Sequence, residues 1–130
     1  MTKALTLEGA RIRDIASFHA EVNRVFMAGE DWALGESLDA LDDMLRGGYG
    51  AIKGREPVRL IWKDMAASRA ALGVEATAAQ LRAKLQRPEV FDVARIARQL
   101  DALERGEGPT YLDTILHILA DHPNIELVAA

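Results

Sequence analysis

The sequence contains no cysteine, which excludes disulfide bonds, a thiolate nucleophile and any metal site that uses cysteine ligands. It also contains no run that approaches the ~20 consecutive apolar residues of a membrane-spanning helix. The first 15 residues lack the apolar segment of a secretory signal. We therefore expect a cytoplasmic protein that does not act at a membrane.

A second absence is local, because residues 30–43 contain neither lysine nor arginine although they hold six acids. The net charge of the chain is −4, and the other 14 acids are outnumbered by 16 bases. One short segment therefore carries the entire negative excess. Its field disfavours nucleic acid as a direct partner and favours a basic protein. The six acids are Glu30, Asp31, Glu36, Asp39, Asp42 and Asp43.

The chain has 130 residues, of which 49% are hydrophobic and 28% charged, as in a globular protein with one core. We predict a single domain over residues 1–130. Alternating or apolar runs predict strands at residues 3–8, 58–62 and 124–130. In the segments between them, apolar residues recur at helical spacing. Strands joined by helical crossovers pair in parallel. The expected class is α/β, with a three-stranded parallel sheet packed with helices.

Several residues mark predicted helix starts, because their side chains or backbone angles suit a first turn. Trp62 in the second strand and His19 in the first helix are expected to serve packing, and His122 is expected at the end of the last helix. The predicted starts are Asp14, Ser37, Asp64, Thr77, Pro88 and Thr110, the last forming a capping box with Asp113.

The acid-rich segment ends in a predicted helix that begins after Ser37 and stops at Gly47-Gly48. Asp39 and Asp43 are four residues apart and share one face of that helix. Acids in a first turn also complement the helix dipole, which gives Asp39 a purely structural alternative. Asp42 is equally open to binding and to structure. The expected buried stripe is Leu38, Leu41, Met44 and Leu45.

Four stretches together resemble the barstar family of ribonuclease inhibitors: LEGARIRDIASFH, LGESLDALDDML, VRLIWKDM and YLDTILHILADHPNIELV. The resemblance covers roughly residues 5–72 and 110–128 and implies a three-stranded parallel sheet with packed helices. Residues 73–109 lie outside it, and we expect two extra helices inserted there. The apolar stripe of the second, Val93, Ile96, Leu100 and Leu103, predicts that it packs on the body of the domain.

The resemblance implies an intracellular inhibitor, or immunity protein, that plugs the active site of a basic ribonuclease and needs no cofactor or metal. In the family, the helix after the Gly-Glu turn and the loop before it enter the catalytic cleft, where carboxylates mimic phosphates. By this resemblance Asp43 is the deepest-reaching carboxylate and Asp39 the second. The free protein is expected to be a monomer without enzymatic activity. The other expected contact residues are Trp32, Ala33, Leu34, Gly35, Glu36, Asp42 and His117.

The chain also departs from the family pattern. Ala33 and Leu34 stand where family members place tyrosines, Asp42 stands at a tryptophan position, and His117 aligns with a contacting glutamate. Trp32 is close to this region, where it would either anchor a partner or fold back onto the core. Because aromatic anchors carry much of an interface's energy, these replacements predict a different cognate partner, such as a diverged nuclease toxin.

Two rival functions remain open from the sequence. The fold would serve a partner unrelated to nucleases if the inserted helices formed the contact surface. Alternatively, Asp39, Asp42 and Asp43 would hold Mg²⁺ for hydrolysis. The second rival is the weaker one, because these acids come from a single helix with no nucleophile, phosphate loop or histidine nearby in sequence.

Overall fold

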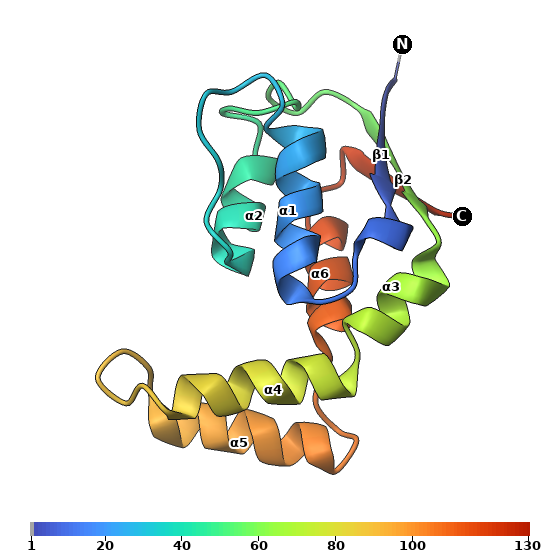
Figure 1. The fold of residues 1–130 in the computed structure, drawn as a ribbon. Coiled ribbons are helices and arrows are strands. Elements are labelled where there is room, and N and C mark those ends of the chain that lie inside the picture. Colours follow the sequence, from blue (N-terminus) through green and yellow to red (C-terminus); the bar gives the residue numbers. More distant parts are fainter. Residues whose placement is uncertain (1) are drawn as a thin grey trace.

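The computed structural model describes residues 2–130 and contains a sheet of three parallel strands (Figure 1). The strands are β1 (Lys3–Glu8), β2 (Val58–Lys63) and β3 (Ile125–Ala129), and β2 lies in the middle. Segments that contain helices join consecutive strands, as parallel pairing requires. The predicted α/β class and the predicted three-stranded parallel sheet are therefore confirmed.

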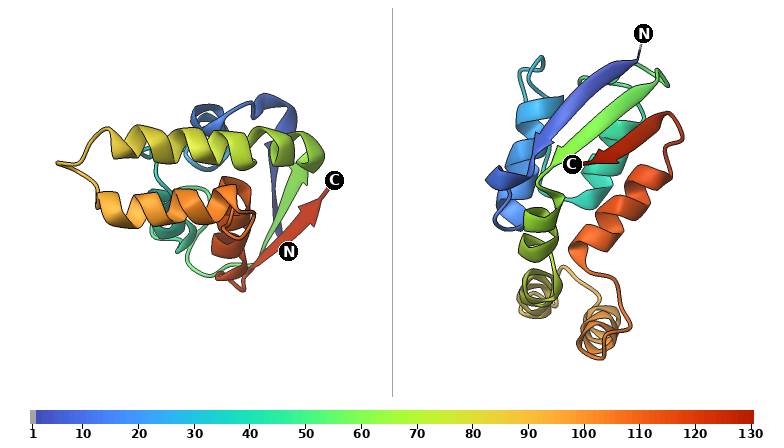
Figure 2. Two further views of the ribbon diagram at one scale, coloured as in Figure 1. Left: turned by 90° about the horizontal axis from the view of Figure 1, so that it is seen from below. Right: turned by 90° about the vertical axis from the view of Figure 1, so that its right-hand side faces the viewer.

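One face of the sheet carries the core. Leu5 and Leu127 flank Leu60 in register, and Leu7 pairs with Trp62. Trp62 is fully buried and donates a hydrogen bond from Nε1 to the Ser68 hydroxyl at 2.9 Å, which confirms its predicted packing role. The helices of the body lie on this side of the sheet, and the opposite side is open (Figure 2).

Three helices cover the core side of the sheet: α1 (Ile15–Phe26), α2 (Leu38–Leu45) and α6 (Tyr111–Ala120). Their starts are the predicted ones, because a local side chain caps each first turn: Asp14, Ser37 and Thr110. A short 3-10 helix, η1 (Gly9–Arg11), follows β1, and α3 (Met65–Ala71) follows β2.

Two other predicted helix starts, Thr77 and Pro88, are wrong, and the start at Asp64 is right in position only. Asp64 precedes α3 but makes no side-chain cap, because its backbone is left-handed with φ at 52°. Thr77 lies inside α4 (Val74–Leu85). Its hydroxyl donates a hydrogen bond to the Gly73 carbonyl at 2.7 Å and accepts one from the backbone N–H of Tyr111. Pro88 does not begin α5 (Val93–Glu104), which starts instead at its cap Asp92.

Helices α4 and α5, which lie in the segment predicted to be an insertion, form a hairpin that projects from the body, and we call residues 74–104 the arm (Figures 1 and 2). The arm has its own small apolar cluster, made by Ala78, Leu81, Ile96 and Leu103. The prediction that the second inserted helix packs on the body is therefore wrong. Its apolar stripe faces α4 instead, because two helices joined by a short loop bury their stripes against each other.

The arm is fastened to the body at the start of α6. The backbone N–H of Tyr111 donates to the Thr77 hydroxyl at 2.8 Å, and that of Leu112 donates to the Leu72 carbonyl at 3.2 Å. The Tyr111 hydroxyl in turn lies 2.7 Å from Nε2 of His19. His19 is buried, which confirms its packing role, and burial lowers its pKa.

We predict that Thr77→Val loosens this junction. The variant removes the acceptor of the buried Tyr111 N–H, and a buried donor without a partner costs about 1–3 kcal/mol. The free energy of unfolding from urea titration should fall by that amount. Thr114→Val is the matched control, because the Thr114 hydroxyl bonds only to Thr110 of its own helix. Equal losses in both variants would contradict the assignment.

Candidate functional site

The acids of α2 are divided between two directions. The side of α2 that carries Leu41, Met44 and Leu45 lies in the core, and these three side chains are buried. Asp39 and Asp43 lie on the exposed side, where their spacing of four residues places them above one another. Asp42 lies between the two sides and is half-buried. The helix therefore presents two of its three carboxylates to solvent.

Asp43 belongs to a small aromatic group on the surface. Tyr49 donates a hydrogen bond from its hydroxyl to the Asp43 carboxylate at 2.8 Å, and this bond raises the pKa of Tyr49. The Tyr49 ring packs against Trp32 with 4.9 Å between ring centroids. Trp32 remains 46% exposed, so it does not fold back onto the core. An aromatic surface thus lies directly beside the predicted binding carboxylate.

Tyr49 is a site residue that sequence reasoning missed. It follows the glycine pair that ends the acidic helix, and the chain turns back there so that Tyr49 meets the helix. The sequence did contain a signal for Tyr49. It is an aromatic residue directly after a glycine turn, and it lies six positions beyond Asp43. We take Asp39, Asp43, Trp32 and Tyr49 together as the candidate site.

The loop before α2 is held by one side chain of α1. Asn23 accepts a hydrogen bond from the Leu34 backbone N–H at 2.8 Å and donates one to the Leu34 carbonyl at 3.3 Å. The Leu34 side chain is only 8% exposed and lies in the core, so its predicted role as a contact side chain needs correction. Its neighbours Ala33, Gly35 and Glu36 are exposed.

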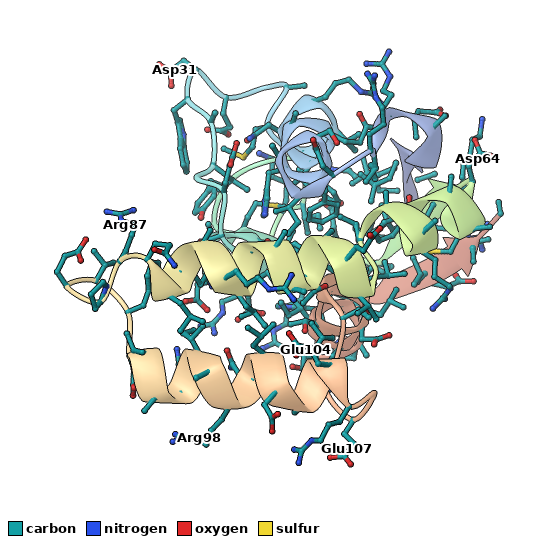
Figure 3. The ribbon with its side chains drawn as sticks, turned by 60° about the horizontal axis from the view of Figure 1, so that its bottom comes forward. Asp31, Asp64, Arg87, Arg98, Glu104 and Glu107 are labelled. Carbon is teal, nitrogen blue, oxygen red and sulfur yellow. The ribbon has the colours of Figure 1, made fainter. Side chains whose placement is uncertain are left out.

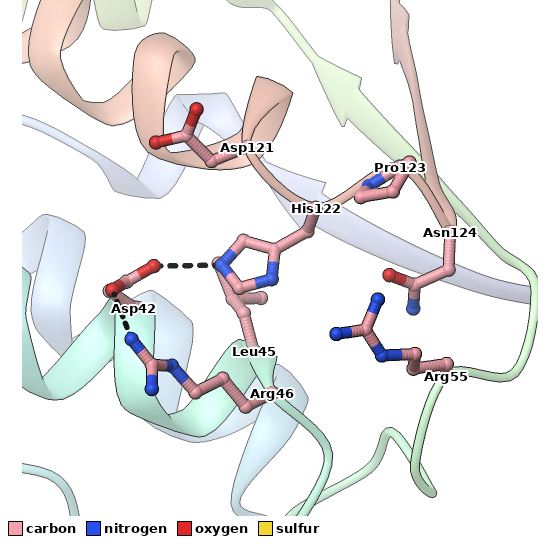
Figure 4. A pocket seen from close by; sticks show the side chains of 8 residues that line it. All are labelled: Asp42, Leu45, Arg46, Arg55, Asp121, His122, Pro123 and Asn124. Carbon is pink, nitrogen blue, oxygen red and sulfur yellow. Dashed lines mark hydrogen bonds and ion pairs between the residues drawn. The ribbon is translucent and has the colours of Figure 1, made fainter.

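Asp42 is engaged inside the molecule. Its carboxylate lies 2.7 Å from Nε2 of His122 and 3.5 Å from the Arg46 guanidinium (Figure 4). The hydrogen bond with His122 is the main reason that the pKa of Asp42 is lowered. His122 follows α6 as expected, but its bond to α2 spans 80 positions of sequence.

The Asp42–His122 pair borders a cavity of about 370 Å³. Asp121, Asn124 and the Arg55 side chain also line it (Figure 4). This cavity separates the end of α2 from the turn between α6 and β3. The pair therefore connects two parts of the fold and gives Asp42 a structural role, and the binding role of Asp42 stays a prediction.

His117 stands apart from these groups. It lies on α6 with its side chain 80% exposed, and its Nε2 is 4.0 Å from the Asp121 carboxylate. Among residues 2–130, no group of three or more histidines and acids is arranged to hold a metal ion. None of the helices formed by these residues is long and apolar enough to cross a membrane.

We predict a small, pH-dependent destabilisation on Asp42→Asn. The pair is partly exposed, so the variant should lose about 0.2–1 kcal/mol of unfolding free energy at neutral pH. The pKa of Asp42 is lowered in the folded protein, so the stabilisation is present above the carboxyl's ordinary range and fades as the pH falls through the lowered pKa. Urea titrations at several pH values measure this difference.

Asp121→Asn is the control, because Asp121 lines the same cavity but its ion-pair contact, with His117, is 4.0 Å long. It should leave the unfolding free energy nearly unchanged at each pH. A loss in Asp42→Asn that persists undiminished in strong acid would contradict the proposed ion pair.

The comparison with protein families agrees with this architecture. The family model described as "Barstar (barnase inhibitor)" matches residues 2–94, which is 93 of the 130 residues. The match contains α2, the loop before it and Tyr49, and it ends inside α5. It therefore includes α4, which we expected to lie outside the resemblance, and leaves out residues 110–128, which we expected to lie inside it. No match was found among curated proteins. Because the family model covers well over half of the sequence, this chain belongs to the barstar family.

Proposed function

We propose that this protein inhibits a basic nuclease of the barnase type by placing the exposed side of α2 in its catalytic cleft. One observation carries the proposal: Asp39 and Asp43 face solvent from a rigid helix, within a segment that has no base of its own. The family to which the chain belongs is described as a barnase inhibitor, which supports this reading. The protein would act in the cytoplasm, where it would protect the cell that makes the nuclease.

Electrostatics favours such an encounter. A nuclease cleft that binds phosphates is lined by cationic side chains, and carboxylates at the same positions form charge-assisted hydrogen bonds. The unbalanced field of residues 30–43 attracts such a cleft over about 10 Å at 0.1 M salt and raises the association rate. In the free protein, these acids repel one another, and a basic partner would relieve that repulsion.

Trp32 and Tyr49 add an aromatic contact surface, which the carboxylates of α2 do not provide. Large, partly exposed aromatic rings are enriched among the residues that dominate binding energy. Trp32 and Tyr49 lie beside Asp43, so they would cover the rim of the contact while the carboxylate is desolvated. This pair would take over the role of the tyrosines that Ala33 and Leu34 replace. Glu36, Gly35 and His117 would contact the periphery, since they are exposed.

The first test is inhibition of a barnase-type ribonuclease by the purified protein. We expect stoichiometric inhibition that weakens with salt, and an inhibition constant for Asp43→Ala that is about 30-fold higher or more, because a desolvated cationic group would lose its partner. Asp39→Ala should act in the same direction. Glu107→Ala is the control, since Glu107 is an exposed acid at the far side of the arm (Figure 3).

Two contrary outcomes would each contradict a different part of the proposal. Full inhibition by Asp43→Ala would disprove the residue assignment while keeping the function. No inhibition by the wild type, with a folded circular dichroism spectrum, would show that the fold serves another partner.

A second test addresses the aromatic pair. Trp32→Ala should raise the inhibition constant about tenfold or more, since it removes a large contact surface. Tyr49→Phe keeps the ring and removes only the bond to Asp43, so its effect should be several-fold smaller than that of Trp32→Ala. An inhibition constant that is unchanged in Trp32→Ala would place Trp32 outside the interface.

A further inference from the structure

We propose that the exposed ring of Trp32 receives an arginine side chain of the partner protein, which stacks on the indole and donates a hydrogen bond to the Asp43 carboxylate. This inference rests on the proposed function in taking that partner to be the nuclease, and it deepens the function by naming the group that the aromatic surface recognises. The arginine would belong to the rim of the catalytic cleft, since Trp32 lies in the loop before α2 and not on the helix.

The exposure of Trp32 is the first support, because its ring is held in place and yet open to solvent. Its exposed fraction is 46%, and no other aromatic residue is among the exposed large hydrophobic side chains of residues 2–130. The ring contacts Tyr49 with an angle of 54° between the two planes, so Tyr49 supports one part of the indole and leaves the rest uncovered. An uncovered indole attracts a cation through its π electrons.

The charge around the ring is the second support. Trp32 belongs to residues 30–43, which hold six acids and no base. Its neighbour Asp31 is exposed, and the Asp31 carboxylate points away from the molecule (Figure 3). The next two bases along the chain, Arg46 and Lys53, are each bonded to another group. In the part of the chain that the structure describes, no cation lies over this ring, so a cation must come from a partner.

The bonding of the Asp43 carboxylate is the third support. Tyr49 donates its hydroxyl to Oδ2 of Asp43 at 2.8 Å, and within residues 2–130 no hydrogen bond reaches Oδ1. The carboxylate is thus held beside the aromatic pair with one oxygen available to a partner. A guanidinium that stacks on Trp32 can donate an N–H from its edge to such an oxygen, and that bond is charge-assisted. The ring and the acid would therefore bind one and the same group.

Arginine fits this surface better than lysine does. A guanidinium is planar and weakly hydrated, so it lies flat on an aromatic ring while its edge still donates to a carboxylate. A lysine ammonium is a compact and strongly hydrated point charge, which loses more on leaving water. Nucleic acid, whose bases also stack on exposed rings, is disfavoured as the occupant because the surrounding acids repel its phosphates.

The first experiment compares two capped tripeptides of equal charge, glycine–arginine–glycine and glycine–lysine–glycine. Their binding is followed by NMR through the Trp32 indole signal and the backbone signals of residues 30–49. We expect the arginine peptide to bind about threefold more tightly or better. Trp32→Leu should abolish this preference, and Trp32→Phe, which retains a ring, should keep part of it. Equal binding of both peptides to the wild type, or a preference that survives in Trp32→Leu, would overturn the proposal.

The second experiment locates the arginine in the complex. Each arginine at the cleft rim of a barnase-type ribonuclease is replaced by lysine, and dissociation constants are measured with the wild type and with Trp32→Leu. One replacement should weaken the wild-type complex about threefold or more and leave the Trp32→Leu complex almost unchanged, since the two groups interact directly. Glu107→Ala, which alters an exposed acid far from this site, is the control and should respond as the wild type does.

The outcomes separate this inference from the proposed function. If Asp43→Ala raises the inhibition constant but no arginine replacement depends on Trp32, the proposed function stands and the arginine site is overturned. If the wild type does not inhibit the ribonuclease but prefers the arginine peptide through Trp32, the nuclease assignment fails and the arginine site stands for another partner protein.

Discussion

Three buried side chains of α2, Leu41, Met44 and Leu45, determine where its carboxylates point. They bind the helix to the core side of the sheet, so the residues between them must face outward at fixed angles. The helix has eight residues, which is too short to be stable alone in water. Its orientation therefore depends on this burial, on the Ser37 cap and on the Asn23 bonds that hold the preceding loop.

The same constraint separates the acids by role. Asp42 is turned toward the α6–β3 connection, where it is hydrogen-bonded to His122, while Asp39 and Asp43 remain without a cationic partner among residues 2–130. Pairing one acid internally lowers the repulsion on α2 and strengthens the attachment of the helix to the body. The carboxylates of Asp39 and Asp43 keep their charge at the surface, where the proposed basic partner would meet it. A surface that stays charged at a cost in stability is typical of a site selected for binding.

Local chemistry made much of this fold predictable from sequence. The caps at Asp14, Ser37 and Thr110 bond within four residues, and the strands are short apolar or alternating runs, so these elements could be located without a structure. The errors share another cause. The role of Thr77 and the Asp42–His122 bond depend on partners 34 and 80 positions away, which no local pattern encodes. The direction of the α5 stripe likewise depends on its packing against Ala78 and Leu81 of α4.

The candidate site was likewise predictable only where local spacing determines it. Spacing alone places Asp39 and Asp43 on one helix face, whereas the Trp32–Tyr49 contact exists only because the chain reverses after α2. A protein that lost the family's aromatic positions but regained aromatic surface from a loop would keep its mechanism and change its partner.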